Sequence, residues 1–402
     1  MLAGYLAFGA TFQELPGWLH ERFGSGAATS GLAIGIAFAA TAGCRPFAGR
    51  LGDAQHARPV VMAGGVLIAV GALGQLLAPN VPLLLAARLV MGAGEAGLFS
   101  AALPWVLAAA APNQRGRVAG WFGLSMWGGL AAGPLVAVGV GHLSGSHAVW
   151  LAVTSLGVVS AVLVTVTPGQ TGERSGPSRS AGWRDIVPDG AGLPGLAFGL
   201  AAYGYGTISA VLILYLTDSG IGGASIGLVV FAGAFLATRS LGSPTVDRYG
   251  GATVATVVLG VEVVGLILLA TVEALPAALI GAAMVGVGLS LTFPATVAMT
   301  LSRTETAGAG SSIGATTSFW DLGILAAGPV SGLLATGPGY SAAFFAAAAA
   351  GLASLAVSAH LRRPQHRAAL APIAPGDVIA MQSRPPDRRG NMARHSADSK
   401  PR

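Results

Sequence analysis

Long apolar segments follow one another along the chain, each about as long as a helix that crosses a lipid bilayer. Runs such as 60–77 and 342–356 are continuously apolar and lack the alternation that strands of a membrane β-barrel require. The pattern therefore predicts about twelve transmembrane helices. We place them near residues 2–19, 27–48, 59–78, 83–110, 119–141, 148–167, 194–216, 223–242, 252–271, 275–300, 310–335 and 341–360.

The amino-acid composition supports this assignment. Hydrophobic residues make up 53% of the chain and charged residues 9%, whereas soluble domains carry roughly a quarter of charged residues. The chain holds 61 glycines, which weaken helices in water but let helix backbones approach closely in a membrane. Cys44 is the single cysteine, so no disulfide can form within the chain. We expect an all-α membrane protein.

Basic residues lie on one side of the predicted spans. If the N-terminus is cytoplasmic, nearly every Arg outside a span falls in a cytoplasmic loop or tail, and Arg22 alone falls outside. This distribution follows the positive-inside rule, so topology explains the net charge of +6 and nucleic acid is not expected as a partner. We expect both termini in the cytoplasm. The first segment is short and interrupted by Gln13 and Glu14; we interpret it as a functional helix inside which the chain begins.

The two halves of the chain resemble each other at a shift of about 194 residues. Arg45 and Asp53 are repeated as Arg239 and Asp247, and the segment 128–134 (GGLAAGP) matches 323–329 (GILAAGP) at six of seven positions. This repeat predicts two six-helix bundles, residues 1–167 and 194–361. Residues 168–193 form a polar linker, and residues 362–402 form a disordered, basic cytoplasmic tail.

These motifs resemble those of the major facilitator superfamily, across about residues 1–361. The segment 49–58 (GRLGDAQHAR) is similar to the family's signature loop, with Ala54, His56 and Ala57 at positions where the family usually has a basic residue, Gly and Arg. The second copy, 247–251 (DRYGG), keeps the basic residue and the Gly. The departures suggest that the cytoplasmic gate of the N-terminal half is weak or relies on Arg45 and Arg58.

Two further motifs carry the resemblance. Arg88 followed by Gly92 and Gly94 is similar to the family's motif in span four, and 129–134 is similar to the span-five motif of the drug:proton antiporter branch. The resemblance implies a carrier that alternates access to a midplane site between two rocking bundles. A phosphate-binding loop that ends in Lys-Ser/Thr is absent from the sequence, whose single lysine is Lys400, so we do not expect ATP-driven pumping.

Ionisable residues inside the predicted spans are the candidates for mechanism, because each is costly in lipid unless it pairs, faces water or titrates. Arg88 and Glu95 are seven residues apart, about two helical turns, and share one face of span four. We expect Glu95 to bind protons or a cationic solute and Arg88 to support its charge; the alternative is a structural ion pair. Asp321 has Met126 as its repeat counterpart, which favours a specific role over a helix–helix hydrogen bond; its place in the cytoplasmic half of the span also allows a role in the inner gate.

The two remaining acids receive weaker assignments. Glu14 lies near the outer end of span one, as a cavity acid or, as we favour, a residue of the outer mouth. Glu262 lies in span nine, which the resemblance places at the periphery. We expect its carboxyl to make a buried hydrogen bond to another helix and to have no role in transport.

Three further groups of residues have expected roles. The first is a cytoplasmic charge lock that closes when the carrier faces outward, with ordinary topology and helix capping as the alternative: Arg45, Asp53, Arg58, Arg239, Asp247 and Arg248. The second is a small-residue face that packs helices closely between the bundles: Gly129, Gly133, Pro134, Gly328 and Pro329. The third is a set of aromatics that line the cavity: Trp127, Tyr203, Tyr205 and Trp320.

The sequence favours a secondary transporter, proton-coupled and exporting a small amphipathic or sugar-like solute, with Glu95 and Asp321 as the titrating residues. Import by proton symport or uniport is an alternative, and so is a non-transporting membrane sensor built on a carrier scaffold. We expect no enzyme, cofactor or metal, because no catalytic or metal-binding constellation is present in the sequence. The expected partners are the lipid bilayer, the solute and protons. The Ala/Gly/Arg-rich composition suggests a bacterial source and therefore a plasma membrane. We expect a monomer.

Overall fold

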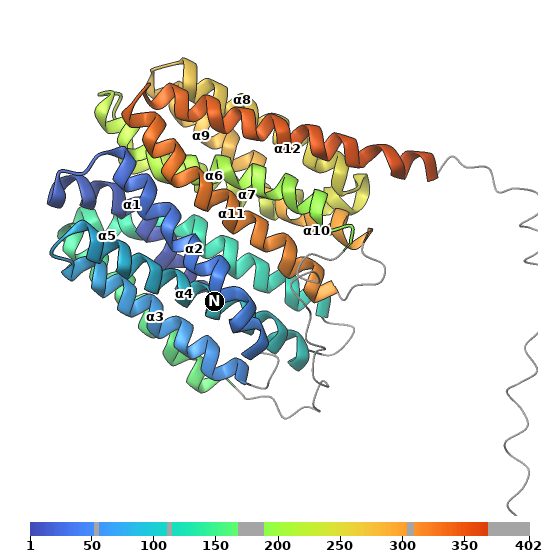
Figure 1. Cartoon of the computed structure of the whole chain (residues 1–402), viewed down its shortest axis with the longest axis horizontal. Helices are drawn as coiled ribbons and strands as arrows, with labels where there is room; N and C mark the ends of the chain where they lie inside the picture. The colour runs from blue at the N-terminus through green and yellow to red at the C-terminus, as the bar shows by residue number, and fades with distance from the viewer. Residues whose placement is uncertain (52–55, 111–114, 168–188, 304–308, 369–402) are drawn as a thin grey trace, which may run out of the picture. The chain divides into compact units, whose positions relative to one another are not determined.

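The structure is a computed structural model, and it describes residues 1–51, 56–110, 115–167, 189–303 and 309–368. Every regular element in these ranges is a helix, and Figure 1 shows their arrangement. The first five are α1 (Leu2–Phe23), α2 (Ala27–Leu51), α3 (Ala57–Leu77), α4 (Val81–Ala109) and α5 (Arg115–Val166). The others are α6 (Gly192–Asp218), α7 (Ala224–Tyr249), α8 (Gly251–Thr271), α9 (Leu275–Ser290), α10 (Thr292–Leu301), α11 (Ala309–Thr336) and α12 (Tyr340–Ala368).

The helices account for the predicted spans. Within the described residues, ten segments are long and apolar enough to cross a membrane, and one of them, 121–166, has 46 residues. That length suits two crossings, and the helix α5 is interrupted at Gly145, whose φ of 78° and ψ of 174° are not helical. Span one corresponds to α1, which is helical but falls outside these ten. The expectation of an all-helical membrane fold is confirmed.

One predicted span is divided. The segment predicted at 275–300 forms α9 and α10, which meet at Leu291 with φ −98° and ψ −2°. Its repeat counterpart in the first half is the continuous helix α4, which has 29 residues. The repeat therefore predicts the positions of these helices but not the break, which belongs to the second half.

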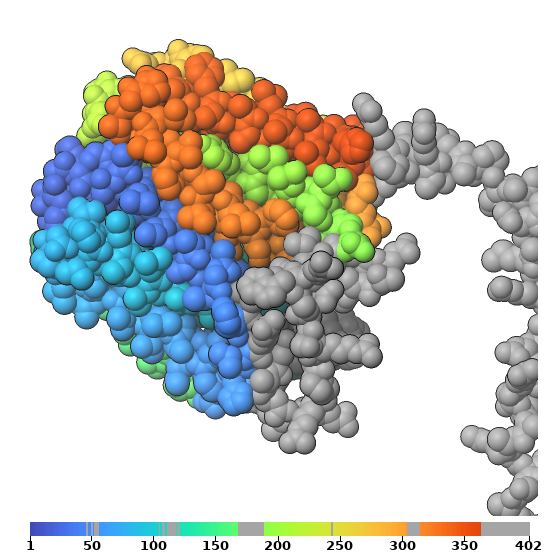
Figure 2. Space-filling model, viewed as in Figure 1, coloured from blue at the N-terminus to red at the C-terminus, as the bar shows by residue number. Residues whose placement is uncertain are grey.

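Residues Met1–Leu361 form one compact unit and Arg362–Arg402 a separate one. The predicted division of the first unit into two bundles, with a linker and a tail, stays a prediction; residues 168–188 and 369–402 lie outside the described ranges. Within the first unit, α1 packs on α5, α3 on α4 and α6 on α11, and α2 packs on both α4 and α11. The contact of α2 with α11 joins the two halves of the sequence, and Figure 2 shows the atoms of the first helices lying against those of α11.

Glycines permit the closest of these contacts. A Cβ atom built on Gly31 of α2 would lie 2.0 Å from the carbonyl oxygen of Gly328 of α11, and one built on Gly133 of α5 would lie 2.4 Å from the backbone nitrogen of Ala10 of α1. Larger side chains at these positions would push the helices apart. Large apolar side chains such as Leu77, Val257 and Leu333 remain exposed, as expected for surfaces that face lipid.

Candidate functional site

One guanidinium group joins the two halves of the molecule. Arg45 Nη2 of α2 lies 3.3 Å from Glu95 Oε1 of α4 and 3.1 Å from Asp321 Oδ1 of α11, and Arg45 Nε also donates to Asp321 Oδ2. The Tyr5 hydroxyl of α1 donates to Glu95 Oε1. We call these four residues, Tyr5, Arg45, Glu95 and Asp321, the Arg45 cluster. Two of the acids predicted from the sequence therefore share one cation.

The cluster is almost dry. The side chains of Arg45, Glu95 and Asp321 are 10%, 5% and 1% exposed. The position of Arg45 near the end of α2 explains how it enters the interior, because helical side chains point back toward the helix N-terminus. The Arg45 guanidinium carbon lies over the face of the Phe99 ring, 4.8 Å from the ring centre, and this cation–π contact stabilises its charge. This environment makes each charge strongly dependent on the others.

The charges in the cluster suit the binding of a single proton. With both carboxylates ionised, the three side chains of Arg45, Glu95 and Asp321 carry a net charge of −1, which is costly in a low-dielectric interior. One proton would make the three together neutral. Because both acids contact the same cation, a proton bound by one of them would change the charge environment of the other.

Arg88 is placed differently from our expectation. It is fully buried, and its guanidinium donates to the carbonyl oxygens of Ala33 at 2.8 Å and Ile34 at 3.4 Å, both in α2. The partners of Glu95 are Arg45 and Tyr5, so the predicted pair of Arg88 with Glu95 is wrong in its partner. Arg88 instead fastens α4 to α2 and lies over the rings of Phe8 and Phe12.

The residues predicted for the cytoplasmic charge lock do not gather at one place. Arg45 is drawn into the buried cluster, and Arg58 donates to the carbonyl oxygens of Val164 and Thr165 at the end of α5. Arg239 donates to the Ser290 carbonyl oxygen at 3.1 Å. Asp247 and Arg248 are exposed near the end of α7, and Asp53 lies outside the described residues.

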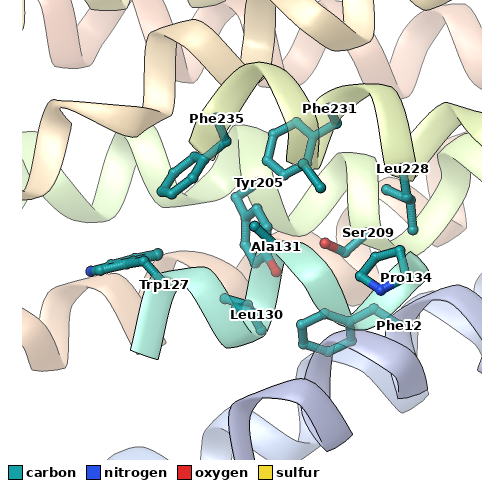
Figure 3. A pocket seen from close by; sticks show the side chains of 11 residues that line it. Phe12, Trp127, Leu130, Ala131, Pro134, Tyr205, Ser209, Leu228, Phe231 and Phe235 are labelled. Carbon is teal, nitrogen blue, oxygen red and sulfur yellow. The ribbon is translucent and has the colours of Figure 1, made fainter. Parts of the chain in front are cut away.

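A largely apolar pocket, in which five of the eleven lining residues are aromatic, lies between helices of both halves. Figure 3 shows Phe231 and Phe235 of α7 facing Trp127 and Leu130 of α5, with Tyr205 of α6 between them. The space not filled by protein atoms is about 370 Å³, part of it open to the surroundings. The complete lining is Phe12, Trp127, Leu130, Ala131, Pro134, Tyr205, Ser209, Leu228, Phe231, Ala232 and Phe235.

Ring contacts connect this pocket with the Arg45 cluster. Trp320, the residue before Asp321, has its ring 4.9 Å from that of Trp127 and 5.6 Å from that of Tyr205. Three of the four aromatics predicted for the cavity are thus brought together. Tyr203 is not among the lining residues and is partly buried elsewhere against the core.

Several residues of the site had no signal in the sequence. Tyr5, Phe12, Phe231 and Phe235 lie in ordinary apolar stretches, where an aromatic is usually a packing residue. Spacing offers a partial signal for the first two, because Tyr5 and Phe12 are seven residues apart and share a face of α1. Sequence spacing does not show which helices pack against this face of α1; the tertiary structure is needed for that.

The small-residue motifs pack helices closely, each against a different partner. Cβ atoms on Gly129 and Gly133 would meet α1, so these glycines join helices within the first half. Gly328 and Pro329 lie against Gly31 and Gly35 of α2 and join the two halves. The expected contact between bundles therefore applies to the second motif and is wrong for Gly129 and Gly133, although Pro134 lines the pocket between the halves.

The remaining acids lie away from the cluster. Glu14 is half-buried near the middle of α1, where the adjacent Gln13 donates to the Ala224 carbonyl oxygen at 3.3 Å. Glu262 is fully buried in α8, and neither of its carboxyl oxygens has a hydrogen-bond partner in the described part of the chain. The hydrogen bond expected for Glu262 is therefore not made. In the described ranges, no group of three or more His, Cys, Asp or Glu side chains could hold a metal ion.

Comparison with known proteins places the chain among transporters. The family model described as Major Facilitator Superfamily matches residues 1–328 and 194–386. An uncharacterized MFS-type transporter of Burkholderia mallei is 33% identical over 376 residues, with 90% of each chain covered. The human organic anion transporter MFSD10 has a similar fold at a TM-score of 0.69 and 17% identity, covering 89% of this chain and 96% of its own. The nucleoside transporter NupG has a TM-score of 0.70 at 11% identity, covering 90% and 97%.

Proposed function

Because the chain belongs to the major facilitator superfamily, we propose that it is a secondary transporter in which the Arg45 cluster couples protons to the movement of a small amphipathic solute. The solute leaves the cell in exchange for protons, across a bacterial plasma membrane. The organism of the similar B. mallei transporter supports a bacterial source. The span-five motif, whose Pro134 lines the pocket, supports export.

The bridge made by Arg45 is the observation that carries this proposal. Arg45 and Glu95 belong to the first half of the sequence and Asp321 to the second. A cation held by carboxylates of both halves stabilises the conformation in which the two halves are in contact at the Arg45 cluster. Alternating access requires such a contact to break and re-form, and it requires the two states to stay close in free energy.

A proton can break the bridge without leaving an unpaired charge. When Asp321 is protonated, Arg45 keeps Glu95 as its partner, and Glu95 keeps the Tyr5 hydroxyl. The link between the halves is then a neutral hydrogen bond, which is weaker than a charge-assisted one. Loss of the proton restores the ion pair. Proton binding and the rocking of the halves are in this way linked through Asp321.

The pocket favours solutes with an apolar, ring-bearing body over sugar-like ones. Trp127, Tyr205 and Phe235 offer ring faces, which stack on flat apolar groups. A sugar needs many hydrogen-bonding groups in its binding site. The polar groups of this lining are few: the hydroxyls of Tyr205 and Ser209 and the Nε1–H group of Trp127. The Trp127 Nε1–H group has no hydrogen-bond partner among the described residues. That indole group suits one acceptor on an otherwise apolar solute.

The proposal is tested with purified protein in vesicles that carry an imposed pH gradient. The solute is first chosen from a compound library by the thermal stabilisation it gives. We expect Asp321→Asn and Glu95→Gln to lower gradient-driven transport by about tenfold or more, since each removes an acid of the proton-binding pair. Exchange of labelled for unlabelled solute should persist, because it needs no net movement of protons.

The control is Glu273→Gln, which removes an exposed acid of the second half that lies outside the helices and should leave both rates unchanged. Undiminished gradient-driven transport in the Asp321 and Glu95 variants would remove the cluster from coupling. Stimulation of uptake by an inward proton gradient would show symport rather than export. If no stabilising compound is exchanged across the membrane, the protein is not a carrier and the sensor alternative gains support.

A further inference from the structure

The carboxyl group of Glu262 is buried without a hydrogen-bond partner at the middle of the membrane span α8. Its side chain is 0% exposed, and the structure gives neither oxygen a partner in the residues it describes. Glu262 is twelfth of the 21 residues of α8, so lipid headgroups and water at either end are about 15 Å away along the helix. A single acid in this position needs an explanation.

The surrounding helices make room for this side chain. A Cβ on Gly204 of α6 would lie 2.2 Å from Glu262 Oε1, and a Cβ on Gly288 of α9 would lie 2.5 Å from Glu262 Cβ. Alanine at either position would collide with Glu262. Both neighbouring helices thus have a glycine beside the acid, and these glycines leave the space that its side chain occupies.

No charged side chain in the described ranges is hydrogen-bonded to this carboxyl. The adjoining helices α9 and α10 carry no titratable side chain in their sequences, and α6 presents Tyr203 and Tyr205 on either side of Gly204. On α7, Arg239 donates to the Ser290 carbonyl oxygen, and on α12 His360 lies near the far end. An ionised carboxylate buried here without a hydrogen-bond partner would cost several kcal/mol, which favours the protonated form.

We propose that Glu262 is a second proton-binding site, which holds its proton while α6, α8 and α9 are packed together and exchanges it with water when α6 moves. The inference extends the proposed transport cycle, since it adds a proton to the second half. Helix α6 provides the connection. Cβ atoms on Gly323 of α11 and Gly206 of α6 would clash with Gly199 and Ala327 respectively, so α6 also lies directly on α11, the helix of Asp321.

Infrared spectroscopy of the full chain in lipid tests this site without any solute. A protonated carboxyl absorbs separately from a carboxylate, and its band shifts in D2O once the proton has exchanged. We expect a protonated-carboxyl band at neutral pH that is absent from Glu262→Gln. Its shift should be slow in the wild type and about tenfold faster in Asp321→Asn, because loss of the ion pair lets α11 and α6 open more often.

Arg45→Gln is a second variant that breaks the same ion pair from the other half, and melting curves identify any variant that fails to fold. Glu273→Gln should change neither the band nor its exchange rate. Three results would overturn the inference: no band assigned to Glu262, immediate exchange in the wild type, or exchange that neither cluster variant accelerates. If the band behaves as expected but no solute is transported, the proposed function fails and the proton site stands.

Discussion

The Arg45 guanidinium donates to two carboxylates, whereas the cation of an isolated ion pair has one. The effect of substituting Arg45 depends on whether the new side chain can serve both carboxylates. Its Nε and Nη2 atoms reach Asp321 while Nη2 also reaches Glu95. A guanidinium group can serve both acids because its donors spread in a plane. An ammonium group carries the same charge at one point.

We therefore expect Arg45→Lys to disrupt the cluster although it conserves the charge. Lysine can satisfy one carboxylate and leave the other buried without a cation, at a cost of about 3–5 kcal/mol in stability or a change in its protonation. Gradient-driven transport should fall by about tenfold or more. Transport and thermal melting of the purified variant measure both effects, and wild-type values for both would show that the fork geometry is unimportant.

The sequence identified the acids of the cluster but not their partner. Glu95 and Asp321 are visible because charges are rare in apolar segments. Helical spacing predicts Arg88 as the partner of Glu95, since both residues lie on one face of the same helix. The actual partner, Arg45, comes from another helix, and its reach depends on how α2 packs between α4 and α11. Sequence spacing contains no information on that packing.

At the scale of helices, the close contact of α2 with α11 depends on glycines, which have no side chain to hold the two backbones apart. Gly31 and Gly328 bring the two backbones together, and Gly35 lies against Pro329 in the same contact. Close approach of this kind increases van der Waals contact between helices in a membrane. The sequence motif at 323–329 indicated a packing surface, but not that α2 would be the helix packed on it.

Gly31→Ala tests this contact. A Cβ atom at Gly31 would lie 2.0 Å from the Gly328 carbonyl oxygen, so we expect a loss of about 1–3 kcal/mol of stability from overpacking. Gly43→Ala in the same helix is the matched control, because a Cβ there would have no neighbour within 4 Å. It should be neutral or stabilising by up to about 1 kcal/mol. Equal melting temperatures for the two variants would contradict the tight contact.

At the scale of the whole molecule, hydropathy located the helices and the resemblance to the major facilitator superfamily is confirmed. Hydropathy did not show the division at Leu291, because α9 and α10 are both apolar and the flanking Ser290 and Thr292 are too weakly polar to interrupt the apolar pattern. The orientation of the molecule in the membrane depends on the arginine distribution, and it stays a prediction.

Cysteine labelling can measure that orientation. In a Cys44→Ser background, we expect Ser144→Cys, at an exposed position beside the turn at Gly145, to react with a membrane-impermeant maleimide in intact cells. Asp247→Cys, exposed near the end of α7, should react only after the cells are permeabilised, because the positive-inside rule places it in the cytoplasm. The reverse labelling pattern would invert the topology and the direction of transport inferred from it.

The division of α9 from α10 distinguishes this segment from its repeat counterpart in the first half. Helix α4 runs through 29 residues as one element, while the second-half segment is divided at Leu291. A helix bends most easily where its hydrogen-bond ladder is interrupted. We therefore expect α4 to move as a rod during the cycle and the second-half segment to bend at Leu291. Bending would then be concentrated beside Phe293 and Arg239, on the side of the second half.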